Sequence, residues 1–434
     1  MEEKTEIETE GVWLGVLATL VTAAALALPA SAWDGAPHTA ISARALQLQD
    51  DADRALFGDR AEAYAAHDCL IPDWVYRKDG SEHYVWDYVG EVLEDTSDPR
   101  FECFHLYPGP AKAYGLLSHY IRAAVAAGRA GRTNDFSSLM GVLSHMLEDW
   151  TCPPHATAGD NMMGILQSYL PPPPGKETVV LHWALETGGF SLDDVASAPR
   201  VLAASPEELA WRLLGTIERD HLAARATIVP MVEAVYRGDT AACSAKQKES
   251  AVRGVRLTAD CVRTVCALVR TSDAGPARAV SLADVMPLQA DRLVYPQSAY
   301  FWDPYWGCPT RDFTFRDGKE RLPLALRRNG VRTEVKGLGF GTKAYSWFLP
   351  KGVFRRFTAE CGLHADLADG TTATVEIRVN GATRTAFPLR GGDDARALVL
   401  TLPADATNLA IRVAGDRAVR KTYFVFGNPE LHFH

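Results

Sequence analysis

Two histidine–carboxylate pairs in this chain have the spacing that lets one helix hold a metal ion. His145 and Asp149 lie four residues apart in "SHMLEDWTCPPH", and His182 and Glu186 lie four residues apart in "LHWALET". On a helix, side chains four residues apart share a face, and helical zinc sites take two ligands from one element in this way. His155 follows the Pro-Pro break after the first pair and adds a third imidazole.

More candidate ligands lie upstream. Asp73 and His83 flank a turn-forming Lys-Asp-Gly sequence, and His38 lies further towards the N-terminus. Asp68 and Asp79 are nearby alternatives to Asp73. Imidazole and carboxylate are the ligands that suit zinc when thiolate is absent.

A single pair of this kind is most often a surface contact or a helix cap. Two pairs together with a Pro-Pro-His sequence are much less expected by chance, so we predict a metal site. The pattern assigns no role to His67, His105 or His119.

The predicted ligands lie in a region with a helical pattern. Helical periodicity covers residues 38–49, 113–130, 135–150, 205–238 and 244–271. Pro153-Pro154 ends the helix that carries the first pair, and "LPPPPGKET" is a rigid connection before the second pair. We therefore predict an all-α domain over residues 33–275.

The pattern changes after "SDAGPARAV", near residue 278. Segments 372–389, 397–415 and 421–433 alternate apolar and polar residues, with Asn-Gly and Gly-Gly turns. This alternation predicts a β-sandwich over residues 278–434. The expected fold class is a mainly α catalytic domain followed by an all-β sandwich domain.

Residues 1–32 have the character of a signal peptide. Residues 11–28 are apolar without a charge, and Ala30-Ser31-Ala32 matches the small-x-small rule for signal peptidase. The acidic start departs from the usual basic start, which leaves a different start codon or an uncleaved anchor as alternatives. We expect cleavage before Trp33 and a secreted, periplasmic or cell-surface protein.

Charge and cysteine content argue against two classes of protein. The formal net charge of −9 argues against a broad electrostatic footprint for duplex nucleic acid. Eight cysteines without a CxxC pair are too few for a disulfide scaffold in a chain of 434 residues. We expect Cys152, which lies beside the candidate ligands, to be buried or disulfide-bonded.

The order and spacing of these residues resemble the superfamily of zinc-dependent phospholipases C and single-strand-specific nucleases. The family's H-x-x-x-D-x-x-x-x-x-H block matches His145, Asp149 and His155, and its later H-x-x-x-[DE] matches His182 and Glu186. The resemblance covers about residues 33–275 and implies a helical fold that holds three zinc ions.

The family's mature N-terminal tryptophan provides a further match. Trp33 and His38 fit the early W-x-x-x-x-H pattern, in which the α-amino and carbonyl groups of the tryptophan chelate one zinc. The resemblance implies three ligand groups: Asp73, His83, His145 and Asp149; His155, His182 and Glu186; and Trp33, His38 and a bridging Asp149.

The resemblance also implies a reaction. Asp73 is preferred over its neighbours because "PDW…H" matches the family's aspartate-then-histidine pair. Zinc-activated hydroxide would attack the phosphorus of a phosphodiester. Asp73 and Asp149 are the predicted catalytic residues, with Asp73 as a proton acceptor beside the water.

The substrate stays open between a phospholipid and a nucleic acid. Glu186 is closer to the phospholipase branch, whereas the spacing of Trp33 and His38 is typical of the nuclease branch. Trp74 and Tyr84 are expected to contact the substrate, around a choline or against a nucleobase, although such aromatics are as often core residues. We favour the phospholipase C-like branch.

The segments "AVSLADVMPL" and "VKGLGFGTKAYSWFLPKGVFRRFTAECGLHAD" resemble the carbohydrate-binding module found at the N-terminus of some glycosidases (NPCBM). The resemblance implies a carbohydrate partner, and a sandwich that only packs on the catalytic domain is the structural alternative. A non-catalytic, metal-stabilised adhesion protein is the alternative of another class. We expect a monomer.

Overall fold

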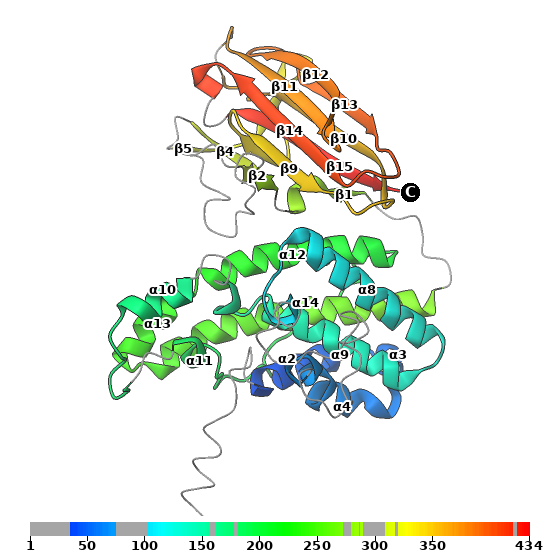
Figure 1. Ribbon diagram of the computed structural model, residues 1–434, viewed down its shortest axis with the longest axis vertical. Coiled ribbons are helices and arrows are strands. Elements are labelled where there is room, and N and C mark those ends of the chain that lie inside the picture. Colours follow the sequence, from blue (N-terminus) through cyan, green and yellow to red (C-terminus); the bar gives the residue numbers. More distant parts are fainter. Residues whose placement is uncertain are drawn as a thin grey trace, which may run out of the picture.

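The computed structural model describes residues 35–74, 103–156, 162–177, 181–271, 279–285, 287–289, 309–316, 320–367, 369–419 and 423–434. The predicted signal peptide, Trp33, His83 and Tyr84 lie outside the described residues. Helices fill the N-terminal part of the described chain and strands fill the C-terminal part (Figure 1).

The helical part of the described chain is built around the long helices α8, α9, α12 and α14, with shorter helices between them. The helices are α2 Gly35–Gln47, α3 Asp51–Arg54, α4 Ala61–Ala66, α5 Ile71–Trp74, α8 Pro110–Arg129, α9 Thr133–Asp149, α10 Met162–Tyr169, α11 Leu181–Ala184, α12 Pro206–Arg225, α13 Ile228–Arg237 and α14 Thr240–Arg270. The α8 helix packs on α9 and α12, and α14 packs on α2, α12 and α13 (Figure 1). Most of the apolar faces of α8, α9 and α12 lie in one large buried core, while α13 and parts of α2 and α14 lie in two smaller clusters.

Local sequence signals set the ends of α12. The hydroxyl of Ser205 accepts a hydrogen bond from the backbone N–H of Glu208 at 3.1 Å, and the Glu208 carboxylate accepts one from the N–H of Ala204 at 2.9 Å. This pair resembles a capping box, except that the glutamate bonds the N–H of the residue before the N-cap. The helical pattern over 205–238 is interrupted between α12 and α13, where Thr227 bonds back to Ala224 at 2.6 Å.

The strand part consists of two antiparallel sheets and two hairpins. The strands are β1 Val280–Ser281, β2 Leu288–Gln289, β3 Thr310–Arg311, β4 Phe313–Arg316, β5 Glu320–Pro323, β6 Ala325–Arg328, β7 Val331–Glu334, β8 Gly337–Phe340, β9 Ala344–Phe348, β10 Phe354–Leu363, β11 Thr372–Val379, β12 Ala382–Arg390, β13 Arg396–Thr401, β14 Asn408–Gly415 and β15 Phe424–Phe433. One sheet has the order β13-β10-β15-β8-β3 with β1 beside β15, and the other has the order β12-β11-β14-β9-β2. The hairpins are β4-β5 and β6-β7.

The two sheets pack face to face. In β11, the buried residues Ala373, Val375, Ile377 and Val379 alternate with more exposed ones, as expected for a strand with one inward face. The ring of Phe340 in the first sheet contacts that of Tyr345 in the second, with centroids 5.4 Å apart. The Asn-Gly turn between β11 and β12 has positive φ at both residues, as type I′ turns require. The predicted fold class, mainly α followed by an all-β sandwich, is confirmed.

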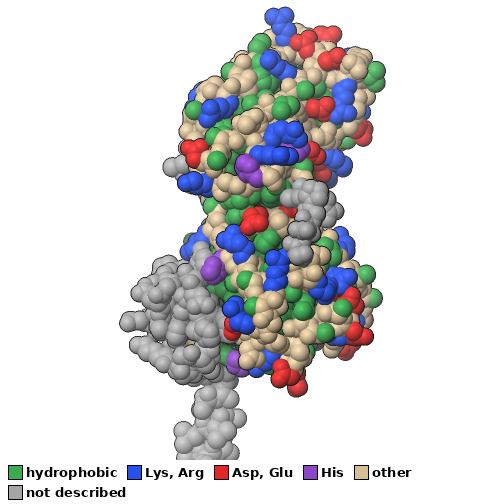
Figure 2. All heavy atoms as spheres, turned by 90° about the vertical axis from the view of Figure 1, so that its right-hand side faces the viewer, with side chains coloured by type: hydrophobic (Ala, Val, Ile, Leu, Met, Phe, Trp, Pro, Cys, Tyr) green, Lys and Arg blue, Asp and Glu red, His purple; other side chains and the backbone are tan. Residues whose placement is uncertain are grey.

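An aromatic cluster joins the helical part to the sandwich. Trp211 of α12 is fully buried and contacts the rings of Phe348 in β9 and Phe354 in β10, at centroid distances of 5.6 and 5.1 Å. Arg311 of β3 pairs with Asp284 at 2.5 Å at the same junction. In the space-filling view the two parts meet at a waist (Figure 2). The sandwich therefore packs on the helical part.

Within the described residues, no helix is both long and apolar enough to cross a membrane.

We predict that Trp211→Ala lowers the free energy of unfolding by about 3–5 kcal/mol, because truncation of a fully buried indole leaves a cavity. Denaturant unfolding followed by circular dichroism measures the loss. Trp183→Ala is the matched control, since its side chain is 39% exposed. An equal loss in the two variants would contradict the role of Trp211 as the apolar link between the two parts.

Candidate metal centre

Residues from five segments of the helical part meet in one buried region. They are His38 of α2, Asp73 of α5, His105 before α8, His145 and Asp149 of α9, His155 in the turn after α9, and His182 and Glu186 in and just after α11. All are buried except His182, whose side chain is 33% exposed. The predicted ligands that the structure describes therefore lie close together, and His105 joins them. The predicted ligands Trp33 and His83 lie outside the described residues.

Asp149 lies at the centre of the first group. Its two carboxylate oxygens face different histidines: Oδ1 lies 3.1 Å from His38 Nε2, whereas Oδ2 lies 3.1 Å from His145 Nε2 and 3.0 Å from His105 Nδ1. Asp73 Oδ1 is 3.9 Å from both of the latter nitrogens. This is the arrangement of a carboxylate that can bridge two ions.

Glu186 holds the second group together. Its Oε1 lies 2.7 Å from His182 Nε2 and 3.1 Å from His155 Nε2. Asp149 Oδ2 lies 3.9 Å from His155 Nδ1, so the two groups adjoin. His145 and Asp149 share α9, whereas α11 ends at Ala184, so Glu186 lies just after the helix that carries His182 and the second pair is not on one helix as expected.

Backbone carbonyls orient two of the imidazoles. His145 Nδ1 lies 2.8 Å from the carbonyl oxygen of Cys69, and His155 Nδ1 lies 2.8 Å from that of His105. Each carbonyl can only accept, so each Nδ1 donates. Nε2 is then left with its lone pair directed towards the carboxylates, which is the tautomer that binds a metal.

A buried glutamate orients the third imidazole. Glu148 Oε2 lies 2.6 Å from His38 Nδ1, and its Oε1 accepts a hydrogen bond from the Ser42 hydroxyl at 2.8 Å. Glu148 follows Met146 and Leu147 on α9 and sits directly before Asp149 in the sequence. A carboxylate behind a histidine ligand is a common way to set its tautomer.

The arrangement of these nitrogen and oxygen atoms suits coordination of a shared divalent cation better than it suits hydrogen bonds between them. Among the described residues, His38 Nε2, Asp149 Oδ1 and Glu186 Oε1 are buried without a hydrogen-bond partner of suitable geometry. Buried polar atoms normally have such partners. Short distances without hydrogen-bond geometry indicate lone pairs that converge on a shared ion, and nitrogen and carboxylate oxygen are zinc ligands.

Burial sets the protonation states of the first group. It lowers the pKa of His38 and His105 well below the ordinary value, and the neighbouring histidines lower it further. Burial also lowers the pKa of His145, which Asp73 partly offsets. Burial raises the pKa of the Asp149 carboxyl well above its ordinary value. The imidazoles are therefore neutral, and the carboxylate needs a cation to ionise.

The second group differs in its charge. Burial lowers the pKa of His155, but Asp149 and Glu186 raise it more, so the pKa lies above its ordinary value. Burial raises the pKa of Glu186, but His155 and His182 lower it more, so its pKa lies below the ordinary value. Protons therefore compete with a metal ion for His155 more strongly than for an ordinary histidine.

His105 is the functional candidate that sequence reasoning missed. It has no carboxylate one helical turn away, so no local spacing marks it. The fold instead brings it to Asp149 and His145, the position for which His83 is predicted. His83 lies outside the described residues and stays a prediction.

Of the predicted substrate contacts, Trp74 is described and Tyr84 is not. The Trp74 ring packs edge-on against His67, with centroids 4.8 Å apart. Its place at the end of α5, directly after Asp73, keeps it beside the metal centre.

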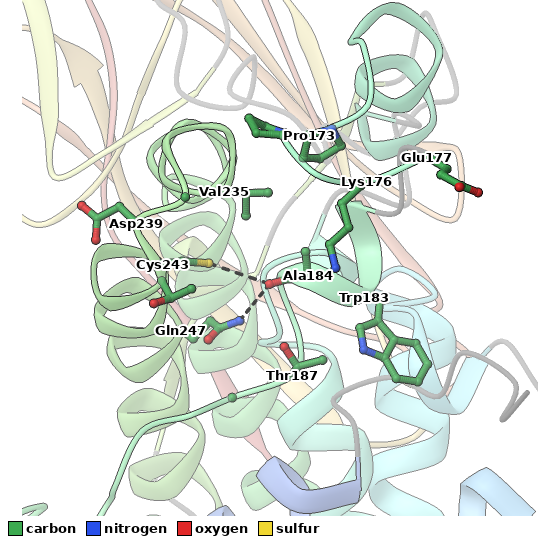
Figure 3. Close-up of a pocket in the computed structure, with 14 residues that line it drawn as sticks. Pro173, Lys176, Glu177, Trp183, Ala184, Thr187, Val235, Asp239, Cys243 and Gln247 are labelled. Atoms are coloured by element: carbon green, nitrogen blue, oxygen red, sulfur yellow. Dashed lines mark hydrogen bonds between the residues drawn. The ribbon is translucent and has the colours of Figure 1, made fainter. Parts of the chain in front are cut away.

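A cavity of about 640 Å³ lies behind the α11 turn (Figure 3). Trp183 and Ala184, which lie between the two ligand positions of that turn, and Thr187, which follows the second, line the cavity. The carbonyl oxygen of Ala184 accepts hydrogen bonds from Gln247 at 3.3 Å and from the thiol of Cys243 at 3.8 Å (Figure 3). These bonds anchor the ligand-bearing turn to α14.

The seven described cysteines are all buried, and none of them forms a disulfide with another. The prediction that Cys152 is buried is confirmed.

No family model matches the chain, and no curated protein matches it. Among solved structures, the alpha-toxin of Clostridium absonum aligns over 93% of this chain and 99% of its own, with 10% identity and a TM-score of 0.34. A Clostridium perfringens alpha-toxin from an avian strain aligns over 94% and 100%, with 10% identity and a TM-score of 0.32.

Carbohydrate-binding modules also align. The tandem CBM51 modules of a family 98 glycoside hydrolase from Streptococcus pneumoniae align over 36% of this chain, with 15% identity and a TM-score of 0.29. The alignment spans 47% of that structure, about half its length. The neighbours thus include clostridial alpha-toxins and CBM51 carbohydrate-binding modules.

We predict that zinc binding by the two groups releases protons from different residues. As the pH rises, binding at His155 and Glu186 should strengthen, because the raised pKa of His155 lets a proton compete with the metal. At the Asp149 group His38 and His145 have lowered pKa values, so the competing proton is the one on the Asp149 carboxyl, whose pKa burial raises. Calorimetry in buffers of different ionisation enthalpy measures the protons released. An unchanged proton release in His155→Ala would contradict this assignment.

We also predict that His105→Ala reduces the zinc content of the purified protein, as judged by elemental analysis, whereas His119→Ala does not. The reason is that His105 faces Asp149, while His119 packs edge-on against Tyr120 on α8. His83→Ala is the informative comparison. If His83→Ala loses zinc and His105→Ala does not, then His83 is the ligand and the assignment of His105 is wrong.

Proposed function

We propose that this protein is a zinc-dependent phosphodiester hydrolase of the phospholipase C type. The observation that carries the proposal is the convergence of buried imidazole nitrogens and carboxylate oxygens around Asp149 and Glu186. Three of these atoms have no hydrogen-bond partner of suitable geometry among the described residues. Such a buried set is destabilising unless a cation is present.

The proposed ligand groups follow the geometry: Asp73, His105, His145 and Asp149 for one ion; His155, His182 and Glu186 for a second; and His38, Asp149 and the Trp33 amine and carbonyl for a third. His83 remains the alternative to His105. Zinc would supply Lewis acidity towards a phosphoryl oxygen and a water of lowered pKa.

The chain's own residues orient the donors and move a proton. Glu148 and two backbone carbonyls hold the imidazoles in the tautomer that points Nε2 into the centre. Asp73 is buried at the edge of the group, 3.9 Å from His105 and His145. We assign it the role of proton acceptor from the attacking water. Asp149 would be shared by two of the ions, and their positive charges would stabilise the reacting phosphate.

A lipid interface is favoured over a nucleic acid. The α10 helix packs on α11, which carries His182, and exposes Ile165 (50%) and Tyr169 (85%). Trp183 of α11 is 39% exposed. Apolar side chains exposed beside the centre suit the surface of a bilayer, whereas single-stranded nucleic acid calls for a positively charged groove.

The amino terminus of the mature protein is part of the proposal. His38 reaches Asp149 from the first turns of α2, which begins at Gly35. Cleavage after Ala32 would free the Trp33 amine two residues before that helix in the sequence. Secretion follows from this assignment. Carbohydrate binding by the sandwich is proposed only from its resemblance to sugar-binding modules.

The central experiment removes Asp149. We expect Asp149→Asn and His145→Ala to lose bound zinc and the hydrolysis of bis-(p-nitrophenyl) phosphate together, by at least about a hundredfold in rate. Asp135→Asn, at an ion pair with Arg132 near the start of α9, is the matched control. Full activity in a variant without zinc would refute a metal-dependent reaction.

A second prediction separates lipid from nucleic acid. The double variant Ile165→Ser, Tyr169→Ser should slow hydrolysis of phosphatidylcholine vesicles severalfold and leave hydrolysis of bis-(p-nitrophenyl) phosphate unchanged. Val399→Ser, which changes a residue 66% exposed on β13, is the control. Cleavage of single-stranded DNA with no action on phosphatidylcholine would instead assign the protein to the nuclease branch.

A further inference from the structure

We propose that the thiolate of Cys152 is a fourth ligand in the group formed by His155, His182 and Glu186. This inference rests on the proposed zinc centre and deepens it. A cysteine at this position adds a soft, negatively charged donor to a set of nitrogen and oxygen atoms. It also changes the role of that ion, because four protein ligands leave it no open position.

The first observation is proximity. Cys152, His155 and Glu186 each present one donor atom, and the three atoms lie within 4.8 Å of one another. All three residues are buried, at 0%, 3% and 2% exposure. Ligand atoms around one tetrahedral zinc are separated by about 3.5–4 Å, given zinc–sulfur and zinc–nitrogen bonds of about 2.3 and 2.1 Å. The cluster is thus of the right size to close on an ion.

The second observation is the state of Glu186. Its Oε1 is buried, makes no hydrogen bond of suitable geometry among the described residues, and lies 2.7 and 3.1 Å from the imidazole nitrogens of His182 and His155. This oxygen points to a cation independently of the cysteine. The thiol therefore lies beside an acceptor that already indicates a metal position.

The backbone fixes the cysteine in place. The N–H of Cys152 donates to Asp149 at 2.9 Å, and its carbonyl accepts from Ala156 at 3.0 Å. This turn brings Cys152 and His155 of "CPPH" to the same ion by a short loop. Rigid backbone on both sides lowers the entropic cost of holding two ligands.

Charge balance favours the thiolate. Two neutral imidazoles and the Glu186 carboxylate leave a divalent ion with one positive charge in a buried group. When the sulfur binds, the S–H bond breaks, its proton passes to solvent, and a sulfur–zinc bond forms. The closed group is then neutral, which suits its burial. Catalysis would depend on the ions that Asp149 bridges.

The test uses the full-length protein with cobalt in place of zinc, and zinc-edge X-ray absorption on the zinc protein. A cysteine ligand gives a sulfur-to-cobalt charge-transfer band in the near ultraviolet and a sulfur neighbour about 2.3 Å from zinc. We expect both signals in the wild type. Cys152→Ser should lose both while keeping its helical circular dichroism, and Cys152→Ala serves if the serine variant does not fold.

Cys261→Ser is the matched control. Its thiol is also buried in the helical part, on α14, but it lies in the apolar core. It should keep both signals. Stoichiometric cobalt without the band, or a band that survives in Cys152→Ser, would overturn the inference and leave the metal centre intact. A protein that binds no cobalt or zinc would instead refute the proposed function itself.

Discussion

The structure depends on one buried carboxylate. Asp149 is fully buried, and its two oxygens face imidazoles from α2, from α9 and from the segment before α8. An ionised carboxylate in such surroundings is costly unless positive charge compensates it. Burial holds its pKa well above the ordinary value, while neutral histidines surround it. A cation at this point would let the carboxylate ionise and join segments that are distant in sequence.

The surrounding architecture keeps that group rigid. Glu148 and the Cys69 carbonyl fix the imidazoles from behind, and the hydrogen bonds from α14 anchor the α11 turn. The α12 helix links this region to the sandwich. His221 on α12 lies 3.1 Å from the carbonyl oxygen of Trp150, next to Asp149, while Trp211 on the same helix packs against the strands. The sandwich therefore supports the helix that lies under the centre.

The sequence could predict what local spacing encodes. The i,i+4 pair of α9, the Pro-Pro turn and the alternation of the strands each act within a few residues, and the structure has them in the expected elements. The second pair is not on one helix, because α11 ends at Ala184 and Glu186 follows it. His105 could not be found in this way, because its role arises only when the segment before α8 folds against α9. The contact of Glu148 with His38 is also long-range, as is the nearness of Cys152 to Glu186. Nothing in a spacing pattern distinguishes these residues from ordinary buried ones.

The most direct measurement is an anomalous-scattering map at the zinc absorption edge, from crystals of the protein saturated with zinc. We expect anomalous density enclosed by Asp149 and the histidines that face it, and a separate peak between His155 and Glu186. A map of well-ordered, zinc-saturated protein with no peak at either position would contradict the central claim that these buried donors converge on metal ions.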